Sequence, residues 1–353
     1  MSNIRMCRRA RARLSVILNY SSSHRAYSSS SKVAANILGR KKNIPDYISP
    51  TNSRLLSISL CDYLPAECLA PLPSLAGASG DLFEPMPQGH HVVYFPLQTQ
   101  PSKLHADGTD MDHWPGEPFE RRMWAGGEVT FRQGWGRELQ LDACPATCVE
   151  SIDDVRLPAM SDNGTSDSNA KAFVDVWRRY SKVGSRMSPA IVERRTLVFF
   201  PRESQDTLKV HRPEKVVTAP HKPDYTISLT PTRALLANFS ALSYNAHSIH
   251  LDTSLAHAEG HRGLLVQGPL SLTLMLAALR GQLVSEDATT RQATKWIGYR
   301  NLAPLYCDEP LTVCLREKGR QEAINEGERR WDVWIEGKSG GMAVKGTATT
   351  NDM

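Results

Sequence analysis

The most uniform hydrophobic segment of the chain covers residues 269–279, where apolar side chains occupy nearly every face of a helix. A helix without a polar face is buried on all sides and does not lie on a surface. The pair Gly268-Pro269 suits its beginning, because proline fits the first helical turn, where its missing N–H would have no helical partner. The pattern therefore predicts one fully buried helix in the second part of the chain.

Shorter apolar stretches predict strands on both sides of this helix. In the second part of the chain the strand candidates are residues 224–229, 293–299, 312–315, 331–336 and 341–349, with a turn expected at 232–238. In the first part they are residues 92–96, 122–132, 139–152 and 190–200, with Gly126-Gly127 as a bend or bulge. The spacing in residues 170–183 fits either a helix or a strand. One long helix among many strands indicates the α+β class.

Two polar segments separate these candidates. Residues 211–223 contain three prolines and several charges, which is typical of a linker. Residues 161–169 (SDNGTSDSN) are low in apolar side chains, so we expect an exposed loop there. A linker at 211–223 would divide the chain into a first and a second half, with the buried helix in the second.

The positive charge of the chain is concentrated at its N-terminus. Residues 1–45 contain ten Lys or Arg residues and no Asp or Glu, and serines cluster at 21–23 and 28–31. This composition is typical of a mitochondrial transit peptide, here residues 1–27, and predicts a mature protein in the mitochondrial matrix. Removing these residues changes the net charge from +5 to −1, which argues against a general nucleic-acid partner. The alternative is a disordered basic tail that binds nucleic acid.

A polar segment with titratable side chains lies shortly before the predicted helix. Asn245, His247 and His250 fall within six residues. Histidine suits acid–base work because its unperturbed pKa, about 6.5, lies near neutral pH. The first turn of a helix has unpaired N–H groups and the positive end of the helix dipole, which stabilise a developing anion. The two features together predict an active site at the helix start.

Three sequence blocks carry a resemblance to a known family. S-Y-N-A-H-S-I-H-L-D at 243–252 resembles the signature of the MaoC-like, (R)-specific hydratase/dehydratases, roughly S-G-D-x-N-P-L-H-x-D, which a segment close to G-x-x-V-H-G follows. The second segment here is G-L-L-V-Q-G at 263–268, and residues 118–127 (PFERRMWAGG) and 299–305 (YRNLAPL) are similar to the mitochondrial type 2 hydroxyacyl-thioester dehydratases. The resemblance covers most of the chain from about residue 71 onward.

The resemblance implies a double hotdog fold, in which two antiparallel sheets each wrap a helix within one chain. Residues 45–215 would form a degenerate N-terminal hotdog, because the N-A-H-S-I-H segment has no copy there. Residues 216–353 would form the catalytic hotdog. The degenerate half would supply the other wall of an acyl tunnel.

The resemblance also implies roles for individual residues. His250 is expected to be the general base, and the backbone N–H of Gly268 the donor to the enolate-like oxygen. Asn245 stands where the family has aspartate; an amide is no base, but it can hold a hydroxyl group or water. His247 replaces an asparagine and is expected as a further catalytic contact or proton relay. The remaining expected contacts are to substrate: Gln267, beside Gly268, and Arg121 and Arg122, whose guanidinium groups suit a phosphate.

The implied activity is dehydration of (R)-3-hydroxyacyl thioesters of acyl carrier protein or CoA, in mitochondrial type II fatty acid synthesis. A hydratase of a short dicarboxylic acyl-CoA, such as a mesaconyl-CoA-like ester, and a non-catalytic acyl-binding protein are the alternatives. No cofactor or metal is expected, since the seven cysteines contain no C-x-x-C pair and the histidines no H-E-x-x-H motif. No run approaches the roughly 18–20 apolar residues of a membrane span. A homodimer is conceivable.

Overall fold

The computed structural model describes residues 37–72, 83–158, 171–201, 216–283, 292–319 and 328–352. The predicted transit peptide at 1–27 and the predicted loop at 161–169 lie outside the described residues. The first part of the predicted linker, residues 211–215, also lies outside them. Within the described ranges, no helix combines the length and the hydrophobicity that crossing a membrane requires.

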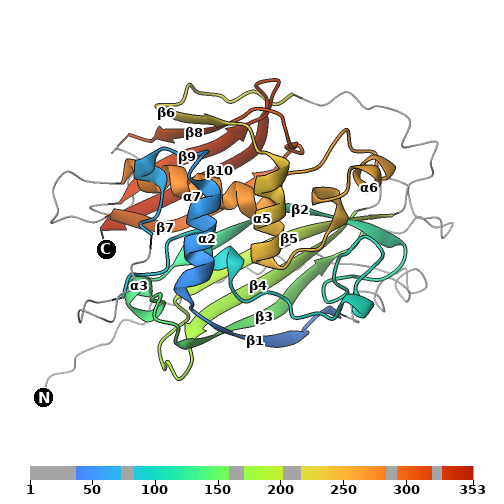
Figure 1. Cartoon of the computed structure of the whole chain (residues 1–353), viewed down its shortest axis with the longest axis horizontal. Helices are drawn as coiled ribbons and strands as arrows, with labels where there is room; N and C mark the ends of the chain where they lie inside the picture. The colour runs from blue at the N-terminus through green and yellow to red at the C-terminus, as the bar shows by residue number, and fades with distance from the viewer. Residues whose placement is uncertain are drawn as a thin grey trace, which may run out of the picture.

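The described strands form one continuous antiparallel sheet, to which each half of the chain gives five neighbouring strands (Figure 1). From its outer edge inward, the first half gives β1 (Lys41–Tyr47), β3 (Pro145–Arg156), β4 (Ala172–Lys182), β5 (Ile191–Pro201) and β2 (Phe119–Phe131). From the centre outward, the second half gives β7 (Gln292–Asn301), β10 (Met342–Asp352), β9 (Arg329–Glu336), β8 (Leu311–Glu317) and β6 (Tyr225–Leu229). From edge to centre, both halves thus place their first, third, fourth, fifth and second strands, so they are topological copies.

The predicted buried helix is α7 (Gly268–Gln282), and all residues from 270 to 279 are buried. It packs against β7, β8 and β9, so the second half of the sheet wraps around it (Figure 1). Burying a helix on all sides removes a large apolar area from water, which is the main force that holds it in place. The prediction from the apolar run is confirmed.

Several strand predictions are confirmed, and one open choice is settled. Residues 170–183 form β4, in which Ala172, Val174 and Val176 are buried at every second position. That period of two is the signature of a strand. The bulge expected at Gly126-Gly127 is present, since the register between β2 and β5 shifts between Trp124 and Gly126.

The strand predicted at residues 92–96 is wrong. Its first residues belong to the 3-10 helix η2 (His90–Val93), which packs against α2 (Pro50–Leu60), α5 (Arg233–Ser243) and α7. Val92, Val93, Tyr94 and Phe95 are all buried, and a short run of this kind fits a buried helical turn as well as a strand. Among the described residues, the first half has no helix as long as α7. The short segment around η2 packs on its strands instead, with the His91 ring against Phe131 and Tyr180.

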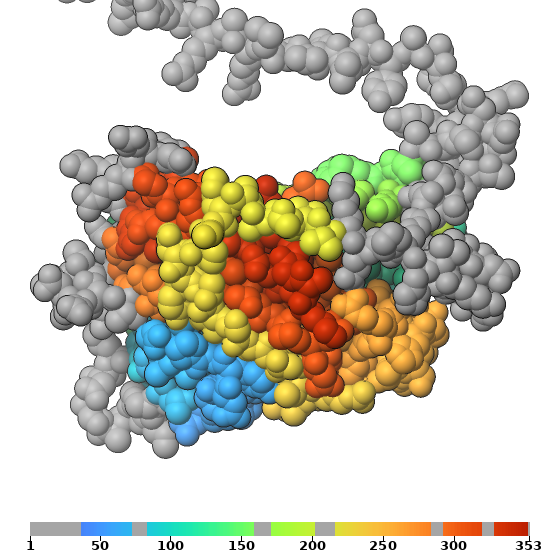
Figure 2. Space-filling model, turned by 90° about the horizontal axis from the view of Figure 1, so that it is seen from above, coloured from blue at the N-terminus to red at the C-terminus, as the bar shows by residue number. Residues whose placement is uncertain are grey.

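The turn predicted at residues 232–238 is also wrong, because α5 occupies this position. Thr232 caps it: the Thr232 hydroxyl oxygen accepts a hydrogen bond from the Leu235 N–H at 3.3 Å. Leu235, Leu236 and Phe239 are buried on one face at helical spacing. Helix α5 packs beside α2 of the first half, and in Figure 2 the blue surface of the first half lies directly against yellow and orange residues of the second.

The first half also contains short helices on either side of β2. The helices η1 (Ala66–Cys68) and η3 (Pro101–Lys103) precede this strand, and α3 (Trp135–Glu138) follows it. In the second half, η4 (Ser248–His250) and α6 (Thr253–Ala258) connect α5 to α7. The predicted histidine segment is therefore a short helical connection held between two longer helices.

Candidate active site

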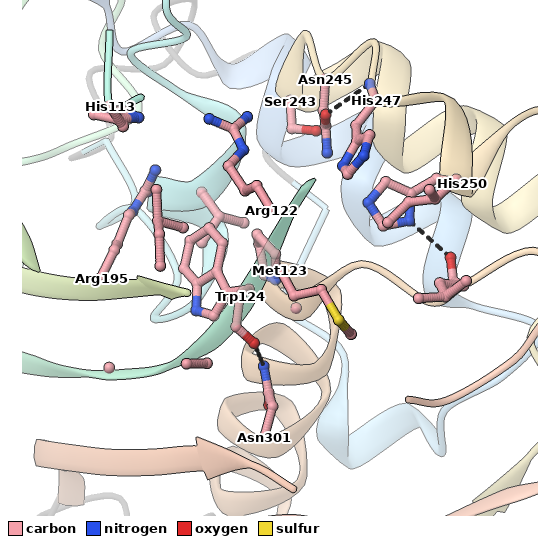
Figure 3. Close-up of a pocket in the computed structure, with 18 of the residues that line it drawn as sticks. His113, Arg122, Met123, Trp124, Arg195, Ser243, Asn245, His247, His250 and Asn301 are labelled. Atoms are coloured by element: carbon pink, nitrogen blue, oxygen red, sulfur yellow. Dashed lines mark hydrogen bonds between the residues drawn. The ribbon is translucent and has the colours of Figure 1, made fainter. Parts of the chain in front are cut away.

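A cavity of about 1210 Å³ lies between the two halves, at the first turn of α7. The first half contributes side chains of β2, β4 and β5, and the second half contributes the segment from α5 to α7 (Figure 3). The structure brings five of the seven predicted site residues to its walls, namely Arg122, Asn245, His247, His250 and Gly268.

His250, the predicted base, ends the short helix η4 and is only 8% exposed. Its Nδ1 lies 2.8 Å from the carbonyl oxygen of Leu265. A carbonyl can only accept, so Nδ1 carries the proton and Nε2 keeps a lone pair. Burial lowers the pKa of His250 to about 4, and the charges of His261 and Arg122 act in the same direction. The imidazole is therefore neutral at pH 7 and can accept a proton.

Asn245 follows directly on the end of α5. Tyr244 there has a left-handed backbone (φ 53°), and the Asn245 N–H donates to the carbonyl of Ser240 at 2.8 Å. The Oδ1 atom of Asn245 accepts a hydrogen bond from the His247 N–H at 3.1 Å (Figure 3). With Oδ1 engaged, the group that Asn245 can offer to a ligand is its Nδ2 amide, a donor.

His247 stands beside His250 with the two rings edge to face and their centroids 5.4 Å apart. Its Nε2 lies 3.6 Å from Oδ2 of Asp107, a residue of the first half. Burial lowers the pKa of His247 well below its usual value, and the neighbouring His250 adds to this effect. Sequence reasoning missed Asp107, because residues 103–118 carry only the polarity of a loop and no motif.

Gly268 begins α7, so its N–H has no partner within the helix. Gln267 at the N-cap position makes no side-chain hydrogen bond to the helix start. A Cβ atom on Gly268 would lie 2.8 Å from Cγ of Trp124. Glycine therefore allows Trp124 of β2 to pack against the helix start, where the Asn301 side chain also holds the Trp124 carbonyl at 2.7 Å (Figure 3). The sequence pattern gave no indication of this contact, because Trp124 lies in the first half and Gly268 in the second.

Gln267 and Arg121 do not line the cavity. Gln267 is fully buried, and its Nε2 donates to the Leu236 carbonyl and to Ser240 Oγ, both at 2.9 Å. Its side chain therefore ties α5 to the start of α7. Arg121 donates to the Glu259 carbonyl at 2.8 Å. These placements lend no support to the predicted substrate contacts of Gln267 and Arg121.

Arg122 lies at the cavity end of a buried chain of charges. Its Nη1 is 2.8 Å from Oδ2 of Asp110, Asp110 is 3.3 Å from His113, and His113 is 2.8 Å from Glu150. Burial alone would raise the pKa of Asp110, but Arg122 and His113 hold it well below its usual range. Arg122 is thus already neutralised by an ionised carboxylate, and a phosphate would have to compete with Asp110.

Asp107, His247 and Glu259 are grouped closely enough to hold a metal ion, with ligand atoms within 4.8 Å of one another. Carboxylate and imidazole groups bind several divalent metals. No sequence motif predicts this group, since Asp107 lies in the first half and the other two residues in the connection between α5 and α7. Arg121 Nε lies 3.7 Å from Glu259 Oε2, so that carboxylate already has a positive partner.

The site combines three chemical capacities. A neutral imidazole with a free lone pair can remove a proton, and the open N–H at the start of α7 can stabilise the negative charge that results. The amide of Asn245 can hold a polar leaving group. This set suits proton abstraction next to a carbonyl followed by loss of a β-substituent.

Comparison with known proteins agrees with this chemistry. The family described as "Hydroxyacyl-thioester dehydratase type 2" matches residues 89–307. The mitochondrial hydroxyacyl-thioester dehydratase type 2 of Schizosaccharomyces pombe is 26% identical over 299 residues, covering 80% of this chain and 92% of the relative. Mesaconyl-C(4)-CoA hydratase of Chloroflexus aurantiacus is 27% identical over 266 residues, covering 74% of this chain and 83% of the relative.

Solved structures confirm the fold that the resemblance implies. A MaoC-like dehydratase of Phytophthora capsici superposes with a TM-score of 0.57 at 12% identity, covering 89% of this chain and 95% of that one. A Mycobacterium tuberculosis protein described as a double hotdog superposes with a TM-score of 0.53 at 10% identity, covering 91% and 98%. The fold is a double hotdog, and the chain belongs to the hydroxyacyl-thioester dehydratase type 2 family and is a hydro-lyase.

Proposed function

We propose that this chain is an (R)-3-hydroxyacyl-thioester dehydratase, which removes water reversibly to give a trans-2-enoyl thioester. The observation that carries the proposal is a neutral His250 in the same cavity as the helix start at Gly268. The test is to follow the loss of enoyl absorbance when purified protein is mixed with crotonyl-CoA. Binding without turnover of any enoyl thioester would favour the acyl-binding alternative.

In the proposed reaction, the thioester oxygen accepts a hydrogen bond from the Gly268 N–H. Nε2 of His250 removes the α-proton, and the negative charge that develops on the thioester oxygen is stabilised at the helix start. The C3–O bond then breaks while Asn245 Nδ2 holds the departing oxygen. His250 returns its proton to that oxygen, so water leaves and the imidazole is neutral again.

The two halves would divide this work. We assign residues 216–353 as the catalytic hotdog, since they contain α7 and the histidine segment. We assign residues 45–215 as the degenerate hotdog, whose side of the cavity receives the acyl chain. Val176, Leu197 and Phe95 of this half line the cavity and provide apolar contacts for it.

The carrier and the location are proposals of the same kind. The S. pombe relative is named as mitochondrial, and residues 1–27 have the composition of a transit peptide. Both support a place in the mitochondrial matrix and in type II fatty acid synthesis, with acyl carrier protein or CoA as the carrier. We also propose that two copies of the chain associate as a homodimer.

A short dicarboxylic acyl-CoA is the second candidate substrate, and two arginines favour it, one buried (Arg178) and one partly buried (Arg195). Arg178 and Arg195 line the cavity, while their partners Glu150 and Glu193 do not. A substrate carboxylate would share these arginines with the two glutamates, just as a phosphate at Arg122 would compete with Asp110. An arginine fork suits a carboxylate, and the Chloroflexus aurantiacus relative is named as a mesaconyl-C(4)-CoA hydratase. Comparing kcat/KM for mesaconyl-C(4)-CoA and crotonyl-CoA distinguishes the two candidates.

The low pKa of His250 predicts an unusual pH profile. The base must be neutral, and its pKa in the folded protein is about 4, so kcat/KM should fall only as the pH drops through about 4. Between pH 7 and 5 the rate should stay constant. The profile is measured from initial rates of crotonyl-CoA hydration at low and at saturating substrate concentration. Circular dichroism at each pH checks that the protein stays folded. An acidic limb near pH 6.5 would contradict the assignment of the base.

Substitutions at Asn245 separate a hydrogen-bond donor from a base. Asn245→Ala should lower kcat by about tenfold, because it removes one hydrogen bond to the hydroxyl group, and should leave the acidic limb in place. Asn245→Asp places a carboxylate beside His250, which favours the imidazolium and raises the pKa of His250. The acidic limb should then move to higher pH. Identical profiles for both variants would show that Asn245 does not face the reacting groups.

A further inference from the structure

We propose that Asp107, from the first half, is a positioning residue for His247, and that it supplies a carboxylate to a site in which Asn245 stands where the family has aspartate. The inference rests on the proposed function. Asp107 would fix the proton of His247 on Nε2, so that Nδ1 offers a lone pair to the substrate hydroxyl or to the attacking water.

The loop that contains Asp107 is attached to the histidine segment by its backbone. The carbonyl oxygen of Asp107 accepts a hydrogen bond from the Ser248 N–H at 2.8 Å. The next residue, Gly108, has a φ of +81°, and a Cβ atom there would lie 2.0 Å from the carbonyl oxygen of Ala246. Only glycine allows this approach, so the contact is built into both segments.

The carboxylate of Asp107 is also oriented. Its Oδ1 accepts hydrogen bonds from the Thr109 N–H at 2.9 Å and from Thr109 Oγ1 at 2.7 Å. This leaves Oδ2, which lies 3.6 Å from Nε2 of His247. The separation is somewhat longer than a hydrogen bond, and such catalytic contacts are often long before substrate binds.

The ring of His247 is buried, so its nitrogen atoms need polar partners within the protein. Its side chain is 7% exposed, and Nε2 is buried without a hydrogen-bond partner among the described residues. Since a buried N–H without an acceptor is costly, a proton on Nε2 is stable only if it points at Asp107. Nδ1 is then the nitrogen left for the cavity, which the ring lines.

The other carboxylates near His247 already have arginine partners. Asp110 pairs with Arg122 at 2.8 Å, and Glu259 pairs with Arg121 at 3.7 Å. Among the described residues, Asp107 forms no ion pair except the one with His247. Besides these groups, His250 and His261 act on His247, and both disfavour its protonated form.

With this role for Asp107, the site has a hydrogen-bond partner for each atom of the water molecule that is added or lost in the reaction. Each water hydrogen has an acceptor, one at Nε2 of His250 and one at Nδ1 of His247, while Asn245 Nδ2 donates to the oxygen. In dehydration the same three groups hold the hydroxyl until His250 delivers its proton. No new covalent step is required, and His250 remains the group that carries the proton.

The test is a double-mutant cycle on the full chain. Asp107→Asn keeps the size of the side chain and an acceptor for Thr109, and we expect kcat for enoyl-CoA hydration to fall by about 10²-fold, with KM changed less. In a His247→Gln background the same substitution should cost less than about threefold. The control is Asp112→Asn, since Asp112 is on the same loop but pairs with Lys42 at the surface. Equal losses in both backgrounds, or no loss in the first, would overturn the proposal.

A second readout does not depend on activity and so separates this inference from the proposed function. Nuclear magnetic resonance of the ¹⁵N-labelled imidazoles reports which ring nitrogen carries the proton. We expect the Nε2–H form of His247 in the parent protein, and a shift toward the Nδ1–H form in Asp107→Asn. An unchanged tautomer would overturn the role of Asp107. So would parent activity that is lost with EDTA and restored by Zn²⁺ or Mn²⁺, because the three groups would then hold a cation.

Discussion

Replacing His250 by glutamine is expected to lower kcat for enoyl-CoA hydration by about 10³-fold, which lies within the usual contribution of a general acid–base group. Glutamine can still donate to the Leu265 carbonyl that now accepts from His250 Nδ1, so the segment should keep its conformation. What the variant loses is a group that can accept and return a proton. Stopped-flow or steady-state loss of enoyl absorbance measures the effect.

His257→Gln is the matched control, because His257 is an exposed histidine on α6, a few residues further along the same connection. It should retain the parental rate. The melting temperatures of both variants should agree with that of the parent. A His250→Gln protein that keeps more than a tenth of the parental kcat would remove His250 from the mechanism.

Gly268→Ala is the second substitution with a large expected effect. The added Cβ would lie 2.8 Å from Cγ and 2.9 Å from Cβ of Trp124, both closer than side-chain carbons approach one another. Either Trp124 or the first turn of α7 must move, and the N–H then no longer points at the thioester oxygen. Loss of one such donor typically costs about 10²–10³ in kcat, and we expect a loss of this size.

Gly319→Ala is the control, because a Cβ at Gly319 meets no atom within 4 Å. It tests whether a glycine substitution as such disturbs the protein. Saturating crotonyl-CoA separates kcat from KM, and a donor to the transition state should change kcat most. An effect on KM alone would show that Gly268 shapes the binding surface and does not stabilise the developing charge.

The parts of the fold that the sequence predicts are those whose burial is visible in a short stretch. Helix α7 was predictable because residues 270–279 are buried on all sides, and a local run of apolar residues records this. β4 was ambiguous because Asp175 and Arg178 are buried charged residues that interrupt the apolar alternation. Arg178 is tolerated there because Glu150 lies 3.2 Å away on β3 and the Phe95 carbonyl accepts from its guanidinium. Spacing along one strand does not show such contacts.

The residues of the site likewise fall into those that a short stretch of sequence predicts and those that it does not. His250, Asn245 and Gly268 could be predicted because they belong to one segment and its following helix. Asp107 could not, because only the folded chain brings its loop to the histidine segment. The direction of the Gln267 side chain depends likewise on the position of α5, which the sequence pattern had not revealed.

The seam between β2 and β7 pairs Gly127 with Tyr299 and Val129 with Ile297 at the centre of the sheet. Because the two halves are topological copies, this seam has the form of a contact between two subunits related by a twofold axis. A dimer of identical subunits must carry every substitution twice. A fused chain escapes this constraint: one half contains the long helix α7, while the other has only the short helix η2 against its strands and presents Asp107 once. Selection can therefore reshape the cavity in one half without altering the base in the other.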